Sequence, residues 1–174
     1  MNRYAIFFVF VLATLLSEAA AAQSIGVGAG TVKLENDNER SLFLTANLRV
    51  KLLGPIFLEP EVGYWKRTLS AGPAEATFED ASLGANGLVV ISGHTLEVFG
   101  GAGMGAHFLD RSAGIAGLIR DSKTTDIAIH LLAGVDVRLS SSVNAFGVVR
   151  RDAFGSDSEA RDQTKFYGGL RFKF

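Results

Sequence analysis

The chain has 174 residues, a length that fits one domain of ordinary size. Its 17 lysine and arginine residues nearly balance its 18 aspartate and glutamate residues, so the sequence lacks the basic excess that nucleic-acid binding requires. Cysteine is absent, which excludes disulfides, thiolate metal sites and a cysteine nucleophile. With 48% apolar and only 20% charged residues, the composition also excludes a disordered chain.

The first segment has the organisation of a secretory signal peptide. Arg3 supplies a positive charge, residues 5–16 are apolar apart from Thr14, and small residues occupy 19–22. The apolar stretch spans about 18 Å as a helix, which is too short for a hydrocarbon core of roughly 30 Å. We therefore expect cleavage after Ala22 and one domain over residues 23–174; an uncleaved membrane anchor is the alternative.

The rest of the chain alternates between apolar and polar residues with a period of two. All even positions from 42 to 52 are apolar, as are all odd positions from 127 to 139. This periodicity predicts β-strands, because helical spacing would scramble both sets. Weaker alternation predicts six further strands, at 24–33, 57–67, 81–91, 95–109, 143–154 and 163–174. These segments are longer than the usual 5–6 residues of soluble strands and match the roughly 9–11 that cross a bilayer.

The connections alternate between two lengths. Long polar connections lie at 34–41, 67–80, 110–123 and 155–162, and tight ones at 53–56, 92–94 and 140–142. Long loops on one rim and short turns on the other are typical of outer-membrane barrels. The sequence therefore predicts an all-β fold: an eight-stranded antiparallel up-and-down transmembrane β-barrel preceded by a cleavable signal peptide.

The hairpin around residues 53–56 predicts a register and an interior face. A three-residue turn over 54–56 places Leu52 opposite Leu58 on the apolar face. The opposite face then carries the charge pairs Lys51–Glu59 and Arg49–Glu61. Since a charge facing lipid costs about 2–4 kcal/mol at the bilayer midplane, the charged face must be the interior.

The same parity predicts an ion-pair network in the barrel lumen. We expect its members to be Arg49, Lys51, Glu59, Glu61, Asp136 and Arg138. An eight-stranded barrel is just wide enough for side chains to fill, so these charges would pair and plug the interior. A conducting path through the lumen is the alternative. Pro60 opposes Val50 and cannot donate to a strand ladder, so we expect a bulge there or a later start of regular pairing.

The C-terminal residues carry the most specific resemblance. The chain ends on Phe174, with Phe172 and Leu170 at the alternate positions before it. This ending, the glycine-rich segment 99–105 and the signal peptide together resemble the small bacterial outer-membrane β-barrel family, of the opacity-protein-like and OmpX/OmpA type. The resemblance implies localisation in the outer membrane, contact with its lipid and lipopolysaccharide, and reading of Leu170, Phe172 and Phe174 as an assembly signal by the barrel-assembly machinery.

No motif for catalysis, metal or cofactor binding stands out. His107, Asp110 and Ser112 form a conceivable base, orienting acid and nucleophile, but their spacing is generic. The lipid A hydrolases among small barrels have a serine that closely follows the histidine on one strand face, and neither His107 nor His130 is followed by one. We therefore predict no enzymatic activity and no cofactor.

The prediction for function is a structural or surface-interaction role through four long extracellular loops, which could also bind extracellular ligands. The alternatives are porin-like passage of small solutes or ions and, less favoured, a lipid A-modifying enzyme. A secreted soluble barrel of lipocalin type is the competing architecture, but it requires a solvated outer face.

Overall fold

The computed structural model describes residues 24–35, 39–71, 74–115, 118–155 and 160–174. They form one closed barrel in which each strand pairs antiparallel with its neighbours in sequence and the last strand pairs with the first. The strands are β1 (Ser24–Leu34), β2 (Arg40–Leu53), β3 (Ile56–Ala71), β4 (Ala74–Ser92), β5 (Leu96–Ile115), β6 (Leu118–Arg138), β7 (Val143–Phe154) and β8 (Gln163–Lys173). The predicted eight-stranded antiparallel barrel is confirmed. The predicted signal peptide lies outside the described residues.

The strands have an apolar outer face and a mixed inner face. In β6, Ile127, Ile129 and Leu131 are each at least 60% exposed, whereas the intervening Ala128 and His130 are fully buried. The same inversion recurs around the barrel, so that its outer surface is apolar. Soluble monomeric proteins rarely expose an apolar surface of this extent to water. Among the described residues, no helix is long and apolar enough to cross a lipid bilayer.

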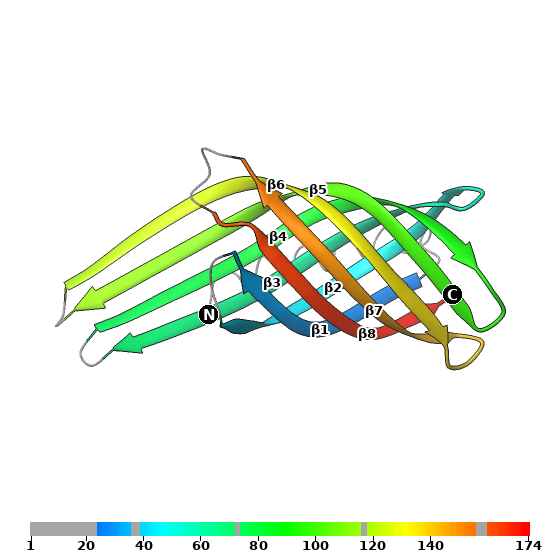
Figure 1. Ribbon diagram of the computed structural model, residues 1–174, viewed down its shortest axis with the longest axis horizontal. Coiled ribbons are helices and arrows are strands. Elements are labelled where there is room, and N and C mark those ends of the chain that lie inside the picture. Colours follow the sequence, from blue (N-terminus) through cyan, green and yellow to red (C-terminus); the bar gives the residue numbers. More distant parts are fainter. Residues whose placement is uncertain (1–23, 36–38, 72–73, 116–117, 156–159) are drawn as a thin grey trace.

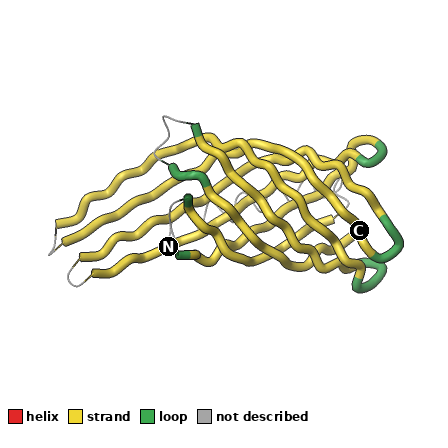
Figure 2. The backbone as a smooth tube through the Cα atoms, viewed as in Figure 1, coloured by secondary structure: helices red, strands yellow, loops and turns green. Residues whose placement is uncertain are grey.

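Two ends of the barrel differ (Figure 1). At the turn end, short turns join β2 to β3, β4 to β5 and β6 to β7, and β8 finishes there (Figure 2). At the other end, β3, β4, β5 and β6 continue beyond the remaining strands as a four-stranded projecting sheet. We call this the hairpin end. The β3–β4 ladder runs to Ala71–Ala74 and the β5–β6 ladder to Ile115–Leu118.

The projecting sheet corrects the prediction of long loops at 67–80 and 110–123, which is wrong for most of both ranges. Polar cross-strand pairs hold these segments as strands: Lys66 Nζ lies 2.5 Å from Glu79 Oε1, and Lys123 Nζ lies 2.7 Å from Asp110 Oδ2. Hydrogen bonding to Glu79 raises the pKa of Lys66. Polar residues occur on both faces of these hairpins, so they lack the alternation by which the other strands are recognised.

The β2–β3 register also differs from the prediction. Val50 pairs with Leu58 and Asn47 with Glu61, a shift of two residues. The turn is the two-residue Gly54-Pro55, with Gly54 at a φ of 54° that favours glycine, and the ladder is irregular between Lys51 and Leu53. The bulge expected at Pro60 is therefore not observed: Pro60 pairs with Ala85 of β4, and the irregularity lies beside the turn. Since side chains alternate with period two, a shift of two leaves the same residues facing inward.

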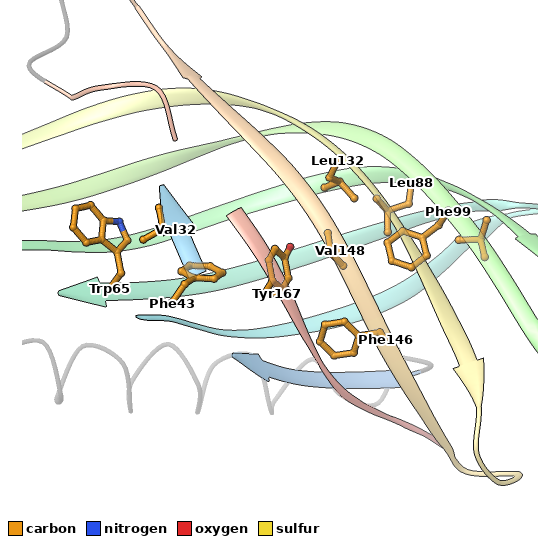
Figure 3. Packing of buried hydrophobic residues seen from close by; sticks show 10 residues of the cluster. Val32, Phe43, Trp65, Leu88, Phe99, Leu132, Phe146, Val148 and Tyr167 are labelled. Atoms are coloured by element: carbon orange, nitrogen blue, oxygen red, sulfur yellow. The ribbon is translucent and has the colours of Figure 1, made fainter. Parts of the chain in front are cut away.

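The interior contains a spine of buried rings and aliphatic side chains as well as charges (Figure 3). Its members include Val32, Phe43, Trp65, Leu88, Val90, Phe99, Leu132, Phe146, Val148 and Tyr167. Cations stack on several of these rings: the Arg49 guanidinium lies 4.3 Å from the Phe99 ring centroid and Lys165 Nζ 4.8 Å from that of Phe43. Such contacts are worth up to about 2 kcal/mol when desolvated, so the rings help to stabilise the buried charges.

Substituting Gly169→Ala tests the close contact between β8 and β1. A Cβ at this position would lie 1.9 Å from Val27 O and 2.6 Å from Gly28 Cα, and these backbone atoms give way only if the strand moves. We expect the free energy of unfolding in urea to fall by about 1–3 kcal/mol for the refolded protein. Gly147→Ala, where no atom lies within 4 Å of the added Cβ, is the control. Equal stability of the two variants would contradict the close contact.

Candidate functional site

A cycle of four alternating charges crosses the lumen toward the turn end. Arg49 lies 2.7 Å from Glu59 and 2.8 Å from Asp136, and Arg171 lies 3.2 Å and 3.3 Å from the same two carboxylates. The four side chains come from β2, β3, β6 and β8, and each is at most 4% exposed. Each arginine therefore bridges two carboxylates, and the cycle ties opposite walls of the barrel together.

A second charged group lies nearer the middle of the barrel. Arg150 is ion-paired with Glu61 and, through Nε at 2.5 Å, with Asp152. Lys165 Nζ lies 2.7 Å from the other Asp152 oxygen, and the Tyr167 hydroxyl donates to Glu61 at 3.0 Å. The members are almost wholly buried. Glu61 on β3 is thus paired with groups from the facing strands β7 and β8, whereas the cations on Asp152 come from its own strand and from the adjacent β8.

His130 is held as a neutral imidazole by this group. Its Nε2 lies 2.9 Å from Arg150 Nη2, which can only donate, so Nε2 accepts. Its Nδ1 then carries the proton and donates to Asn86 Oδ1 at 3.3 Å. His130 is fully buried, and both of its ring nitrogens are satisfied.

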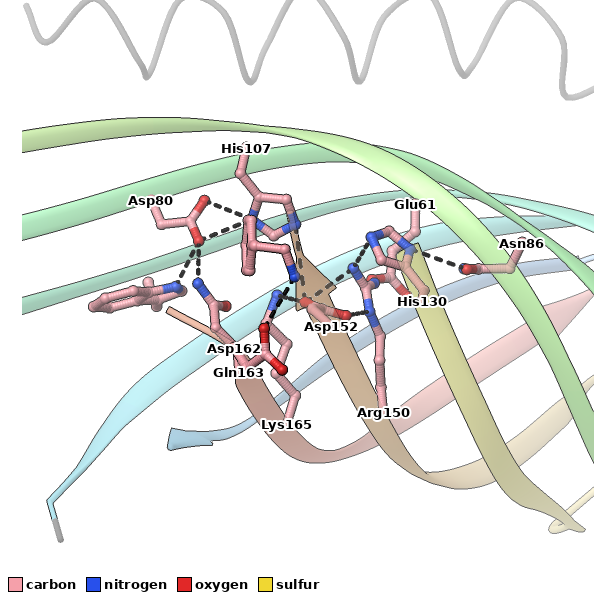
Figure 4. A network of polar contacts seen from close by, with 12 residues as sticks. Glu61, Asp80, Asn86, His107, His130, Arg150, Asp152, Asp162, Gln163 and Lys165 are labelled. Atoms are coloured by element: carbon pink, nitrogen blue, oxygen red, sulfur yellow. Dashed lines mark hydrogen bonds and ion pairs between the residues drawn. The ribbon is translucent and has the colours of Figure 1, made fainter. Parts of the chain in front are cut away.

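Asp80 organises a third group near the hairpin end (Figure 4). Its carboxylate accepts from Trp65 Nε1 at 2.9 Å, from Gln163 Nε2 at 2.9 Å and from His107 Nδ1 at 2.9 Å. With Nδ1 donating to Asp80, His107 Nε2 faces Asp152 Oδ2 at 3.9 Å. One buried carboxylate therefore fixes the orientation of three side chains from three other strands.

The structure places the six residues predicted for the lumen network in three settings. Arg49, Glu59 and Asp136 meet in the four-charge cycle, while Glu61 belongs to the Arg150 group. The predicted pairs Lys51–Glu59 and Arg49–Glu61 are wrong, because the register shift places Arg49 against Glu59. Lys51 and Arg138 are exposed side chains near the turn end.

The six residues predicted for the network left out Arg150 and Arg171, as well as Asp80, Asp152 and Lys165. Asp152 and Lys165 have the inward parity of β7 and β8, so the alternation contained the signal that identifies them. Asp80 lay in a segment predicted to be a loop, where parity has no meaning. It became visible only when the structure extended β4 to Ala74.

The structure does not bring together the catalytic set His107, Asp110 and Ser112. Asp110 pairs with Lys123, and the carboxylate that orients His107 is Asp80. His107, His130 and Asp152 do place ligand-type atoms within 4.8 Å of one another. These donors do not fit a metal ion, because Arg150 and Lys165 already occupy both Asp152 oxygens and Arg150 donates to His130.

Each end of the lumen contains a cavity. The hairpin-end cavity, of about 350 Å³, is lined by Trp65, Arg67, Phe78, Leu109, Arg111 and Gln163 among others. The turn-end cavity, of about 400 Å³, is lined in part by Arg49, Lys51, Glu97, Arg171 and Lys173. The charged groups described above lie between them. Small ligands bind in concave sites of this size, so the two cavities are the candidate binding sites of the described chain.

Replacing Asp80 by asparagine tests its organising role. Asp80→Asn removes the charge and one acceptor oxygen that three buried donors share, so we expect a loss of about 3 kcal/mol in the free energy of unfolding. Trp65 is the only tryptophan, so its fluorescence should report the loss of the indole hydrogen bond. The control is Asp110→Asn, which breaks the more exposed pair with Lys123 and should cost about 0–1 kcal/mol. If both variants unfold at the same urea concentration, Asp80 has no special role.

Comparison with known proteins identifies the fold. No family model and no curated protein matches the sequence. Neisserial surface protein A superposes with a TM-score of 0.63 at 14% identity, over 87% of this chain and 95% of that one. The attachment invasion locus protein Ail of Yersinia pestis, solved with the heparin analogue sucrose octasulfate, gives 0.61 at 13% identity, over 88% and 97%. A major outer membrane protein of Thermus thermophilus gives 0.69 at 13% identity, over 88% and 100%. The chain thus has the eight-stranded barrel fold found in small outer-membrane proteins.

Proposed function

We propose that this protein is an integral β-barrel of the bacterial outer membrane that presents an interaction surface at its hairpin end. One observation carries the proposal: the outward side chains of a closed barrel are apolar while its charges are buried and paired inside. In water this arrangement would expose a continuous apolar surface, whereas in a bilayer it satisfies both faces. The shared fold with three outer-membrane or surface proteins supports the same location.

The hairpin end is the side proposed to face the exterior. Short turns and long extensions on opposite rims follow the plan of bacterial barrels, in which short turns face the periplasm. The projecting sheet then stands clear of the bilayer and forms the described surface that is available to partners. The partners proposed within the membrane are its lipid and lipopolysaccharide.

The C-terminal strand supports recognition by the barrel-assembly machinery. Leu170, Phe172 and Phe174 are 42%, 39% and 76% exposed. Leu170 and Phe172 lie on the outer face of β8, and Phe174 follows the strand at the turn end, where it also lines the turn-end cavity. We propose that they act as an assembly signal, as the resemblance to small outer-membrane barrels implies.

An interaction role is favoured over catalysis because His107, the histidine that a carboxylate orients as in a catalytic acid–histidine pair, is inaccessible. His107 is fully buried, Asp80 holds its Nδ1, and it lines neither end cavity. The Ail barrel bound to a heparin analogue supports ligand binding from outside the cell as a use of this fold. In this chain, Arg67, Arg111 and Arg161 line the hairpin-end cavity together with Glu79, and Arg67 is ion-paired with Glu39.

A pair of arginine substitutions on one face of β6 tests the membrane assignment. Leu131→Arg places a charge in the apolar outer belt and should reduce the stability of the protein folded in lipid vesicles by about 2–4 kcal/mol. Thr125→Arg lies on the same face six residues toward the projecting sheet and should change stability by less than about 0.5 kcal/mol. Urea unfolding in vesicles measures both. Equal effects, or recovery of the native protein in the soluble periplasmic fraction, would overturn the assignment.

Recording in planar bilayers separates the interaction role from porin-like passage. Because ion pairs from facing strands cross the middle of the lumen, we expect no steady conductance from the wild-type protein. Glu61→Ala removes a partner of Arg150 and should produce, at most, brief openings. A steady wild-type conductance that changes with this substitution would favour the porin alternative.

A further inference from the structure

We propose that two exposed cations on the outer face of the barrel, Lys33 and Arg40, bind the phosphate head group of an acylated lipid in the outer leaflet of the membrane. Lys33 lies one residue before the end of β1 and Arg40 is the first residue of β2, near the hairpin end (Figure 1). We call these two residues the basic pair. The inference rests on the proposed function, since it names the head group and the residues for the lipid contact proposed there.

The basic pair consists of like charges that face each other directly. Lys33 and Arg40 are register partners in the β1–β2 ladder, and both are exposed. They point away from the lumen, because Val32 beside Lys33 is buried in the interior spine, whereas Leu42, on the same face as Arg40, is 63% exposed. Like charges directly opposite each other destabilise a sheet. The barrel therefore has an electrostatic cost at this position that a bound anion would remove.

The described carboxylates beside the basic pair are engaged by other cations. Glu35 lies 3.3 Å from Arg151 Nη2, and Glu39 lies 2.6 Å from Arg67 Nη2. Asp162, which is bonded to Glu35 through the backbone, is also held by Arg151, at 3.0 Å. Within the part of the chain that the structure describes, the basic pair has no ion-pair partner. Its charge is therefore available to a ligand.

The apolar belt of the barrel begins directly below the basic pair. Two residues farther toward the turn end, the register aligns Leu42 of β2, Thr31 of β1 and Phe166 of β8 on the same face. The Arg40 guanidinium lies 6.0 Å from the Phe166 ring centroid, so this cation stays beside the belt. A charge that borders an apolar surface matches a membrane lipid, whose polar head lies next to its acyl chains.

Small side chains on β1 provide a track for one acyl chain. Thr31 and Ala29 follow Lys33 on the outer face of β1, and the register places them beside Leu42 and Leu44 of β2. Phe166 stands on the other side, on β8. Since neighbouring strands lie about 4.8 Å apart, the larger side chains on the two sides are separated by roughly 10 Å, with only small side chains between them. A chain that lies along this track begins at the basic pair.

The charge of the basic pair favours a phosphate monoester over a carboxylate. A phosphate monoester has nearly two negative charges at neutral pH, which matches two cations, whereas a carboxylate has one. Arginine binds phosphate through parallel N–H donors, and lysine binds it as a point charge. A soluble phosphate would neutralise the basic pair but leave the track empty. The inference therefore commits to a phosphate that is joined to acyl chains.

Titration with a defined lipid tests the inference, with bound lipid counted by native mass spectrometry of the folded protein in detergent micelles. The probe is dioleoyl phosphatidic acid, and the matched probe without phosphate is dioleoylglycerol. We expect one saturable site for phosphatidic acid and only weak binding of dioleoylglycerol. Lys33→Gln should raise the Kd of phosphatidic acid about tenfold, as the loss of one charge-assisted contact requires. The control Lys66→Gln removes the same charge from β3, where the lysine already pairs with Glu79, and should change this Kd less than about twofold.

Urea unfolding shows whether Lys33→Gln acts through binding or through the fold. Because the substitution removes one of two opposed like charges, the unfolding midpoint in lipid-free micelles should equal or exceed that of the wild-type protein. With phosphatidic acid added, the wild-type protein should become the more stable of the two, since a ligand stabilises the protein that binds it more tightly. A variant that is less stable under both conditions would show a structural role for Lys33 and overturn the inference.

Three further outcomes would contradict the site. These are equal affinity for phosphatidic acid and dioleoylglycerol, equal loss of binding in Lys33→Gln and Lys66→Gln, and full competition by soluble glycerol 3-phosphate; no competition by a large excess of glycerol 3-phosphate supports a lipid. Fractionation separates this inference from the proposed function. A barrel that is found in the membrane and is destabilised by Leu131→Arg, yet binds both lipids alike, refutes this inference alone, whereas a barrel in the soluble periplasmic fraction refutes both.

Discussion

The pairing of buried charges across the lumen is the interaction on which the barrel depends. Arg49, Glu59, Asp136 and Arg171 come from four strands, and each makes both of its ion pairs only when the sheet closes. Removing one member would leave a buried charge without a partner, which costs about 3–5 kcal/mol. Closure therefore stabilises the charges, and the charges select one way of closing. This mutual dependence also determines which side chains remain for the outside: the apolar ones.

The same interior separates the two ends of the molecule. Charged groups and rings fill the middle, and each end of the lumen has a separate cavity with its own lining. The hairpin end gains its special character from Asp80, which fixes Trp65 and Gln163 beneath apolar walls. A barrel filled for stability thus provides a rigid floor for the hairpin-end cavity, and the projecting sheet supplies walls that the barrel alone lacks.

Alternation of side chains predicted most of the fold because it follows directly from the geometry of a strand between two different solvents. In β6, the run from Ile127 to Leu139 needs no further information to place its faces. The alternation did not predict the projecting hairpins, because they stand outside the lipid and do not need a strictly apolar outer face. Asp80 was missed for the same reason, since it lies in one of these hairpins. The β2–β3 register was missed by two residues because the Gly54-Pro55 turn and the irregularity beside it depend on local backbone geometry.

The contrast between the membrane-facing barrel and the projecting sheet has a consequence for how the chain can change in length. A single-residue insertion within β2 or β3 below Trp65 reverses the two faces and sends Arg49 or Glu61 toward the apolar side. Near the tip of the hairpin that joins β3 to β4, the same insertion exchanges one wet face for another. Gains and losses of single residues are therefore tolerated at the hairpin end and excluded in the barrel wall. The surface proposed to meet partners can vary in length, whereas the barrel wall that carries it cannot.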